Sequence, residues 1–259
     1  MPWAALLVVL DGGVVSPPPP AIVESELVYD RAPFRSAHAS TIAETRDGLV
    51  AAWFGGTQEG QPDVGIWVSR RERRRWSPPV EAANGLQPDG TRHPCWNPVL
   101  FQPSNGPLLL FYKVGPSPRE WWGLVRTSAD GGRTWAAARR LPEGILGPIR
   151  AKPLELPGGE LIAGSSTEHA GWVAHLERFA SPSGGWTGEA LSSARSWTRS
   201  ADLNDPEEFG AIQPTILLHS PKRWQLLCRS RQGVITEVWT EDGGATWGRM
   251  SATPLPNPS

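Results

Sequence analysis

The feature that most constrains this 259-residue chain is an eight-residue motif that it contains twice. The first copy reads SADGGRTW over residues 128–135 and the second reads TEDGGATW over residues 240–247. Consecutive glycines favour a tight turn, because glycine reaches positive φ without steric cost. The aspartate can accept hydrogen bonds from N–H groups of its own turn, and the tryptophan can bury a large apolar surface. We expect each copy to be a self-satisfied turn anchored by an indole. Its residues are Ser128, Asp130, Gly132, Thr134 and Trp135 in the first copy, and Thr240, Asp242, Gly244, Thr246 and Trp247 in the second.

Two weaker copies extend the pair to a series. One reads SRRERRRW and ends at Trp76, and the other reads SPSGGW and ends at Trp186. The four tryptophans at positions 76, 135, 186 and 247 are therefore 59, 51 and 61 residues apart. Internal repeats with a period of roughly 40–50 residues are typical of β-propeller blades.

Each interval contains the same order of short apolar segments. Residues 38–54, 97–115, 152–168 and 213–231 each predict a strand, a turn with Gly or Pro, and a second strand. A third strand follows at 64–70, 122–128, 171–179 and 233–241, and no segment shows a useful helical period. Four such sheets in series predict an all-β fold, a β-propeller with four recognisable blades. A β-sandwich would explain the strands but not the regular spacing of the tryptophans.

Composition excludes several classes of partner. The net charge is −1, which does not favour nucleic acid or an anionic membrane. The basic run over residues 70–75 lies in a degenerate copy of the turn motif, and we interpret it as a solvent-exposed hairpin. Cys95 and Cys228 fit neither a disulfide framework nor metal-ligand spacing, so we expect no cofactor and no metal. No segment is long enough to span a membrane, and localisation and oligomeric state stay open.

The N-terminal segment differs from the rest of the chain. Residues 4–10 are apolar but too few for a membrane span, and four prolines follow at 17–20. We expect residues 1–22 to be a disordered or signal-like tail. The propeller is expected over residues 23–259.

The motif S-x-D-x-G-x-T-W resembles the Asp-box, or BNR repeat, of the sialidase-like superfamily. This resemblance covers residues 23–259 and implies a sialidase-type propeller, for which six blades are expected, so that four blades would form a partial, C-terminally truncated propeller. It also implies an exo-acting glycosidase, with exo-α-sialidase as the activity of the family. Asp-boxes lie at the outer edge of blades, so they indicate the fold more strongly than the activity.

Sialidases bind the substrate carboxylate with three arginines and use an Asp acid/base and a Tyr nucleophile paired with a Glu. By this resemblance, His38 takes the place of the first arginine, with Arg35 three residues earlier, and Arg229 matches the second arginine. Gln213 takes the place of the Glu, and a glutamine cannot accept a proton from tyrosine. No local motif supplies the third arginine or the tyrosine. These departures predict a non-standard site.

In a propeller, the starts of first strands and the loops after second strands point toward the central funnel. This rule and the resemblance together predict the site residues. The candidate catalytic residues are His38, Glu59, Asp63 and Glu168, and the candidate substrate-binding residues are Arg35, Trp96, Asn97, Tyr112, Lys113, Lys152, Gln213, Arg229 and Arg231. Each also has an ordinary interpretation, namely a structural histidine, a solvated loop charge or a packing aromatic.

Three functions stay open at this point. The first is a glycosidase acting on an acidic or other glycan, with a pair of carboxyl groups such as Glu59 or Asp63 with Glu168. The second is a polysaccharide lyase on the same scaffold, with His38 or Tyr112 abstracting a proton beside a carboxylate held by Arg229. The third is a non-catalytic glycan-binding propeller or an incomplete fragment. A glycan is the expected partner in all three.

Overall fold

The computed structural model describes residue 22 and residues 24–181 and 185–257. Four antiparallel sheets follow one another along this part of the chain, and we call them blades 1 to 4. Blade 1 comprises β1 (Ser36–Thr45), β2 (Gly48–Gly56), β3 (Gly65–Glu72), β4 (Arg75–Trp76) and β5 (Val80–Ala83), and blade 2 comprises β6 (Cys95–Phe101), β7 (Leu108–Val114), β8 (Trp122–Ser128) and β9 (Arg139–Arg140). Blade 3 comprises β10 (Leu154–Glu155), β11 (Leu161–Thr167), β12 (Val173–Phe179) and β13 (Trp197–Arg199), and blade 4 comprises β14 (Ala211–Leu218), β15 (Trp224–Ser230), β16 (Val234–Thr240) and β17 (Ser251–Pro256).

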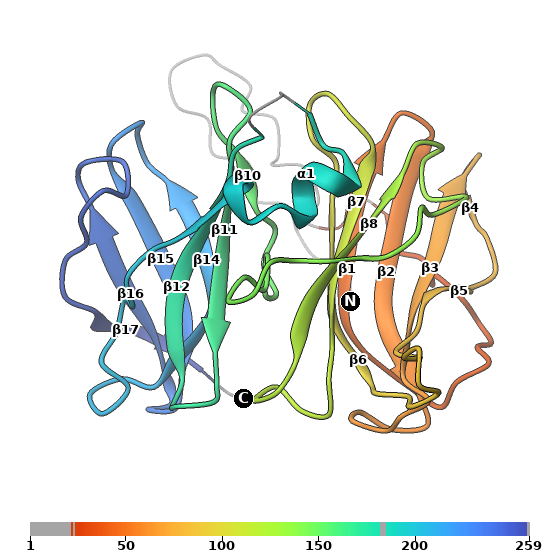
Figure 1. Cartoon of the computed structure of the whole chain (residues 1–259), viewed down its shortest axis with the longest axis horizontal. Helices are drawn as coiled ribbons and strands as arrows, with labels where there is room; N and C mark the ends of the chain where they lie inside the picture. The colour runs from red at the N-terminus through yellow and green to blue at the C-terminus, as the bar shows by residue number, and fades with distance from the viewer. Residues whose placement is uncertain (1–21, 23, 182–184, 258–259) are drawn as a thin grey trace, which may run out of the picture.

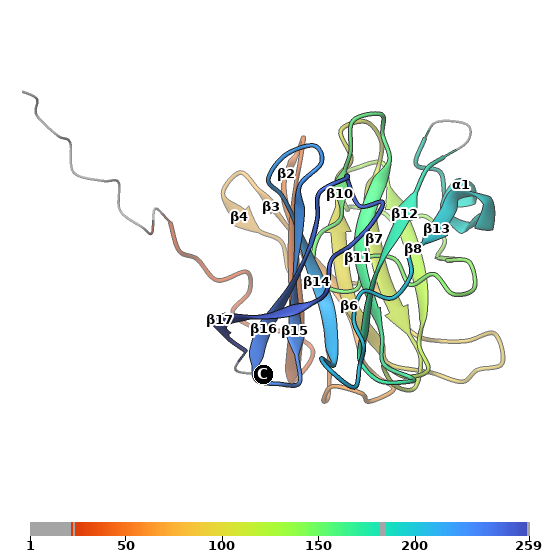
Figure 2. The same ribbon diagram turned by 90° about the vertical axis from the view of Figure 1, so that its left-hand side faces the viewer.

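The blades stand side by side with their strands roughly parallel to one direction, vertical in Figure 1. Blades 1 and 2 form one side of the molecule and blades 3 and 4 the other, and Figure 2 shows the same sheets after a quarter turn. Within a blade, each strand pairs with the next one in sequence, and in blade 1 β5 also pairs with β3. The all-β propeller with four blades that the sequence predicts is confirmed.

The core lies between blades. In the described part of the chain, the buried side chains form three apolar clusters, one at each junction of consecutive blades. Strand β7 shows why both sides of a blade are apolar: Leu110 packs toward blade 1, whereas Leu109 and Phe111 pack toward blade 3. Successive residues of a strand point to opposite faces, so a strand between two neighbours is buried on both.

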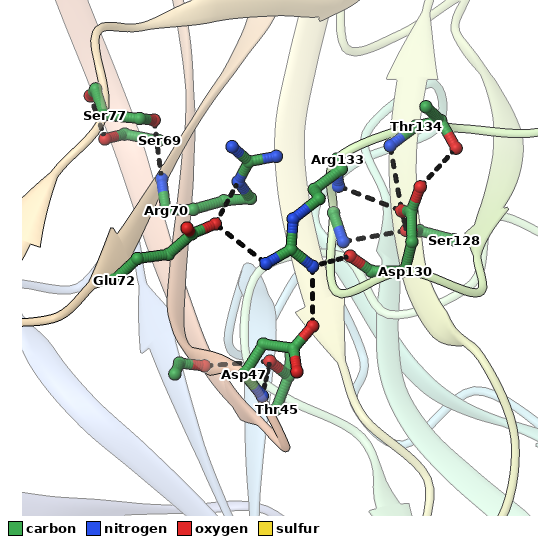
Figure 3. A network of polar contacts seen from close by, with 12 residues as sticks. Thr45, Asp47, Ser69, Arg70, Glu72, Ser77, Ser128, Asp130, Arg133 and Thr134 are labelled. Carbon is green, nitrogen blue, oxygen red and sulfur yellow. Dashed lines mark hydrogen bonds and ion pairs between the residues drawn. The ribbon is translucent and has the colours of Figure 1, made fainter.

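The two Asp-box turns satisfy their own polar groups. The carboxylate of Asp130 accepts hydrogen bonds from the N–H groups of Arg133 (3.0 Å) and Thr134 (2.9 Å) and from the Thr134 hydroxyl (2.6 Å). The buried hydroxyl of Ser128 donates to Asp130 (2.8 Å) and accepts from the N–H of Gly132 (2.8 Å), as Figure 3 shows. Asp242 makes the matching bonds to Thr240, Ala245 and Thr246.

The tryptophans of these turns pack against the inter-blade clusters. Trp135 lies against the cluster of blades 1 and 2, and Trp247 lies against the cluster of blades 3 and 4. Trp186 is a buried member of the cluster between blades 2 and 3. The repeated indole is therefore an anchor that holds the outer turn of one blade against the junction with its neighbour. The described part of the molecule shows no equivalent role for Trp76 in these clusters.

A β-bulge recurs near the start of the first strand in three blades. The pairing of first and second strands shifts register after His38, Trp96 and Ile212. The next residue in each case has a positive φ, 55° at Ala39, 39° at Asn97 and 58° at Gln213. Non-glycine residues rarely adopt this conformation, and bulges of this kind re-aim side chains beside functional sites. In blade 3 the equivalent segment is irregular, because β10 begins only after Lys152 and Pro153.

The structure contains local features that the sequence-based expectations did not include. A short helix, α1 (Gly188–Ser192), interrupts the all-strand pattern and begins where the Thr187 hydroxyl accepts from the N–H of Ala190 (3.1 Å). The 3-10 turn η1 (Ala194–Ser196) follows it. Of the expected tail over residues 1–22, residues 1–21 lie outside the described residues. In the segment just before β1, Tyr29 and Phe34 pack on Trp53 in blade 1.

Candidate functional site

The candidate site lies along the rim where the first strand of each blade begins and the second strand ends. A row of aromatic contacts connects blade 1 to blade 2 along this rim. Phe54 in β2 contacts the ring of Trp96 edge-on at 6.2 Å between centroids, and the ring of Trp96 contacts Trp121 edge-on at 6.0 Å. Arg150, which leads into blade 3, donates to the carbonyl of Ser40 in β1 (3.2 Å). The inner strands of blades 1 and 3 therefore face the same space.

On blade 1 the candidates are a histidine and two acids. Nδ1 of His38 lies 3.9 Å from Oε2 of Glu59, an ion pair when the imidazole is protonated, and the two side chains are 66% and 51% exposed. Asp63 is engaged differently, because its carboxylate accepts from both the N–H (2.8 Å) and the hydroxyl (2.6 Å) of Thr57. These bonds hold the pKa of Asp63 below its ordinary value. They also join residues 57 and 63 of the loop between β2 and β3.

Blade 2 contributes an aromatic floor and corrects two expectations. Trp96 is 6% exposed and donates its indole N–H to the carbonyl of Gly115 (2.9 Å), and Asn97 is 8% exposed at the bulge. Tyr112 and Lys113, expected to line the funnel, are 2% and 0% exposed. Both lie in the middle strand β7, whose faces are covered by blades 1 and 3, so neither side chain reaches the rim.

Lys113 belongs to a fully buried polar cluster between blades 2 and 3. Its ammonium donates to the carbonyl of Pro148, and burial lowers its pKa to about 7 against the opposing charge of Glu177. The carboxylate of Glu177 accepts from the N–H groups of Leu146 (3.0 Å) and Gly147 (2.6 Å) and contacts Nε2 of His175 (3.0 Å). These hydrogen bonds of Lys113 and Glu177 therefore hold the backbone of residues 146–148 in place.

Blades 3 and 4 bring together an acid and two arginines. Glu168, half-buried, follows β11, and Arg229 and Arg231 lie at the end of β15. Burial raises the pKa of Glu168, whereas a hydrogen bond from Trp172 and the charges of Arg229, Arg231 and Arg119 act in the opposite direction. The guanidinium carbons of Arg229 and Arg231 lie 5.0 and 4.7 Å from the centroid of the Trp172 ring.

The remaining candidates lie nearby with fewer contacts. Gln213 is half-buried at its bulge, and its N–H donates to the hydroxyl of Ser166 (3.3 Å), which joins blades 3 and 4. Arg35 is exposed, and its backbone N–H donates to the carbonyl of Gly56 (3.1 Å). Lys152 is exposed just before β10. The structure places Arg229 and Arg231 on one ring, that of Trp172, and places His38 beside Glu59.

A cavity of about 250 Å³ opens beside this rim between blades 2 and 3. Its walls include Arg119, Trp121, Glu168 and His169, together with the segment 141–146 that the buried cluster supports from behind. A larger groove of about 1010 Å³ lies at the opposite rim, along the first Asp-box turn. That groove is lined by Asp47, whose carboxylate is already paired with Arg133, and by packing tryptophans, so it offers no acid and base in position for chemistry.

Other kinds of site find no support in the described residues. Within residues 24–181 and 185–257, no group of three His, Cys, Asp or Glu side chains is placed to hold a metal ion. Cys95 and Cys228 are both buried as free thiols. No helix in this part of the structure combines the length and the hydropathy of a membrane span.

A family model described as a BNR repeat-like domain matches residues 47–259. The chain belongs to this family. It is 29% identical over 126 residues to an exo-alpha-sialidase of Aspergillus fumigatus, a match that spans 49% of this chain and 29% of that protein.

Solved structures show the same fold. A Dyadobacter fermentans protein of unknown function superposes with a TM-score of 0.69 at 16% identity, over 90% of this chain and 73% of the other. The NanB sialidase of Streptococcus pneumoniae superposes with a TM-score of 0.65 at 11% identity, over 88% of this chain and 54% of the other. The resemblance of the BNR-repeat protein to the sialidase-like superfamily is confirmed at the level of the fold.

The sequence reasoning missed two residues of the rim, Trp172 and Arg119. Trp172 follows the turn after β11, a place that the funnel rule includes, but a single tryptophan among 14 gives no signal of its own. Arg119 lies in the loop between β7 and β8, and only its nearness to Glu168 marks it. Only the tertiary structure therefore identifies Trp172 and Arg119 as residues of the rim.

Proposed function

We propose that this BNR-repeat protein is a sialidase-like glycoside hydrolase that removes a terminal acidic sugar from a glycan. The observation that carries the proposal is the placement of Arg229 and Arg231 on the ring of Trp172 at the rim of the propeller, where their charges act on the half-buried carboxyl group of Glu168. Guanidinium groups suit a carboxylate ligand, and a partly buried carboxyl group with a raised pKa suits a general acid. The similarity to an exo-alpha-sialidase supports the substrate class.

In the proposed reaction, Glu168 gives its proton to the glycosidic oxygen as the bond from that oxygen to the anomeric carbon breaks. Water then attacks the anomeric carbon, and His38, beside Glu59, accepts the proton that the water releases. The products are the free sugar and the alcohol, and solvent restores both protonation states. This route uses no tyrosine nucleophile. Tyr112 is buried, and Tyr29 packs on Trp53 in blade 1.

The test compares fluorogenic glycosides. Purified protein is incubated with 4-methylumbelliferyl α-N-acetylneuraminide, the matching β-glucuronide and the neutral β-galactoside. Hydrolysis of an acidic glycoside, lost in Glu168→Gln and retained in the exposed-site control Glu44→Gln, supports the proposal. Hydrolysis of the neutral substrate alone contradicts it. A product with new ultraviolet absorbance from a uronate polymer indicates a lyase instead.

A non-catalytic glycan-binding propeller is the second candidate. The observation that favours it is the separation of 3.9 Å between His38 and Glu59, which is longer than a hydrogen bond. Both side chains are also more than half exposed. Binding of acidic sugars without turnover of any of the three glycosides would select this function.

A further inference from the structure

The segment that connects blade 2 to blade 3 is buried although it has no regular structure. It lies between β9 and β10, and we call residues 145–150 the crossover. Residues 145–149 are all buried, and Ile149 is only 1% exposed. A buried segment outside helices and strands has backbone N–H and C=O groups that need hydrogen-bond partners from elsewhere. The partners of the crossover therefore show what holds it in place.

Two charged side chains supply several of these partners. The carboxylate of Glu177 in β12 accepts from the N–H groups of Leu146 (3.0 Å) and Gly147 (2.6 Å). The ammonium group of Lys113 in β7 donates to the carbonyl of Pro148, a residue that has no N–H of its own. Both charged side chains are 0% exposed. Charge-assisted hydrogen bonds shielded from water are strong, so blades 2 and 3 grip the crossover firmly.

The crossover ends at Arg150, which reaches across to blade 1. The N–H of Ile149 donates to the carbonyl of Gly164 in β11 (3.1 Å), so the residue before Arg150 is fixed on blade 3. The half-buried Arg150 donates from its guanidinium group to the carbonyl of Ser40 in β1 (3.2 Å). These two residues are 110 positions apart in the sequence. The crossover thus joins blades 1, 2 and 3.

Ser40 belongs to the β-bulge that follows His38. The pairing of β1 with β2 shifts register between His38 and Thr41. A bulge leaves a residue outside the regular ladder, so its backbone depends on donors from other elements. Arg150 is such a donor at Ser40, and on the other side of the bulge the hydroxyl of Thr41 accepts from the N–H of Leu100 in β6 (3.2 Å). The bulge is therefore held from neighbouring blades.

We infer that Arg150 is a positioning residue, and that its bond to Ser40 fixes the bulge that presents His38 at the rim. Lys113 and Glu177 act through Arg150, because they hold the crossover from which it reaches. The inference rests on the proposed function for His38 being the base that accepts a proton from water. It links charges buried between blades 2 and 3 to a reacting group on blade 1.

The imidazole of His38 depends on its backbone for its position. Its ring contacts Phe54 edge-on at 5.5 Å between centroids, and Glu59 lies 3.9 Å from it. A displacement of about 1 Å can lower turnover by about 10²-fold. The two arginines proposed to bind the substrate belong to blade 4. Loss of the bond from Arg150 should therefore lower kcat and change KM little.

The first experiment records the imidazole signals of His38 by NMR in the full chain labelled at histidine, with the signals assigned by their loss in His38→Ala. We expect Arg150→Met, which removes the guanidinium group, to shift these signals. Arg150→Lys keeps a cationic donor and should leave them close to those of the parent. Glu177→Gln should shift them in the same direction as Arg150→Met. Arg195→Met is the matched control, because Arg195 is exposed in η1, and it should leave the signals unchanged.

The second experiment measures kcat and KM for the acidic glycoside, well below the unfolding midpoint of each variant. We expect kcat to fall about tenfold or more in Arg150→Met, with KM within about threefold of the parent. Arg150→Lys should recover most of the loss. The control Arg195→Met should keep both constants.

Unchanged His38 signals in a folded Arg150→Met variant would overturn the inference, and so would equal shifts in Arg150→Met and Arg195→Met. If Arg150→Met does not fold, Arg150→Gln decides, because its side chain is polar but too short to span the same distance. Parental His38 signals in Arg150→Gln would then overturn the inference.

The two experiments separate this inference from the proposed function. If the signals of His38 shift as expected and the parent hydrolyses no glycoside, the proposed function fails while the positioning of His38 by Arg150 stands. If the parent hydrolyses the acidic glycoside and Arg150→Met keeps the parental kcat, the inference fails while the proposed function stands.

Discussion

Gly164 in β11 lies directly against the carbonyl oxygen of Pro214 in β14, so closely that a Cβ on Gly164 would be 2.2 Å from that oxygen. Pro214 follows the bulge residue Gln213, and the N–H of Gln213 donates to the hydroxyl of Ser166 in the same strand as Gly164. Blade 4 therefore approaches blade 3 backbone to backbone at the rim that carries the arginines. A side chain at position 164 would push the two strands apart.

We expect Gly164→Ala to destabilise the protein by several kcal/mol, at the upper end of overpacking substitutions, which typically cost about 1–3 kcal/mol. The reason is that the obstructing atom belongs to the backbone and cannot rotate away. Chemical denaturation measures the change. Gly188→Ala is the matched control, because its Cβ would meet only the flexible side chain of Arg139 at 3.2 Å. Equal stability of the two variants would contradict the proposed close packing.

Glu177→Gln tests the buried cluster between blades 2 and 3. The substitution removes the charge that faces Lys113 and places an amide where the N–H groups of Leu146 and Gly147 need acceptors. Removing one charge from a buried polar cluster typically costs about 3–5 kcal/mol, because the opposing charge is left uncompensated. The measurement is the free energy of unfolding. The double variant Glu177→Gln with Lys113→Met is expected to recover part of the loss, and simple additivity of the two changes would show that the residues are not coupled.

The Asp-box turns predict a specific response to acid. Hydrogen bonds hold the pKa values of Asp130 and Asp242 below their ordinary value of 3.8. A lowered pKa stabilises the folded state above the ordinary value, and this contribution is lost as the pH falls through the lowered pKa. Asp130→Asn should therefore lower the unfolding midpoint by a few degrees at pH 7, and the difference from the parent should shrink below about pH 4. A constant difference across this range would mean that ionisation of Asp130 plays no part.

His38→Ala separates chemistry from folding. His38 is 66% exposed, and its charged neighbour Glu59 lies 3.9 Å away, so the substitution should leave the unfolding midpoint within about 2 °C of the parent. Loss of a general base typically lowers turnover by about 10²–10⁴-fold. Any hydrolysis of the acidic glycoside should fall by that order, and Glu59→Gln should show a smaller loss. Turnover at the parental rate in His38→Ala would remove His38 from the mechanism.

The sequence alone determined the repeat and therefore the fold. The Asp-box motif contains its own hydrogen-bond donors and acceptors within eight residues, so its structure depends little on the rest of the chain. The alternating strands and the spacing of the tryptophans then leave the propeller as the natural arrangement. The rule that loops after second strands face the rim also predicted Glu168 and Arg229 as site residues, because Glu168 follows β11 and Arg229 lies at the end of β15.

Only the tertiary structure decided which polar residues of the strands reach that rim. Tyr112 and Lys113 are neighbours in β7, so they must point to opposite faces, and packing by blades 1 and 3 buries both. Likewise, the pairing of Arg229 and Arg231 on Trp172 joins residues nearly 60 positions apart, which no local pattern records. The hydrogen bonds of a turn depend only on the residues of that short segment. Burial and the grouping of charges depend on contacts between blades that are far apart in the sequence.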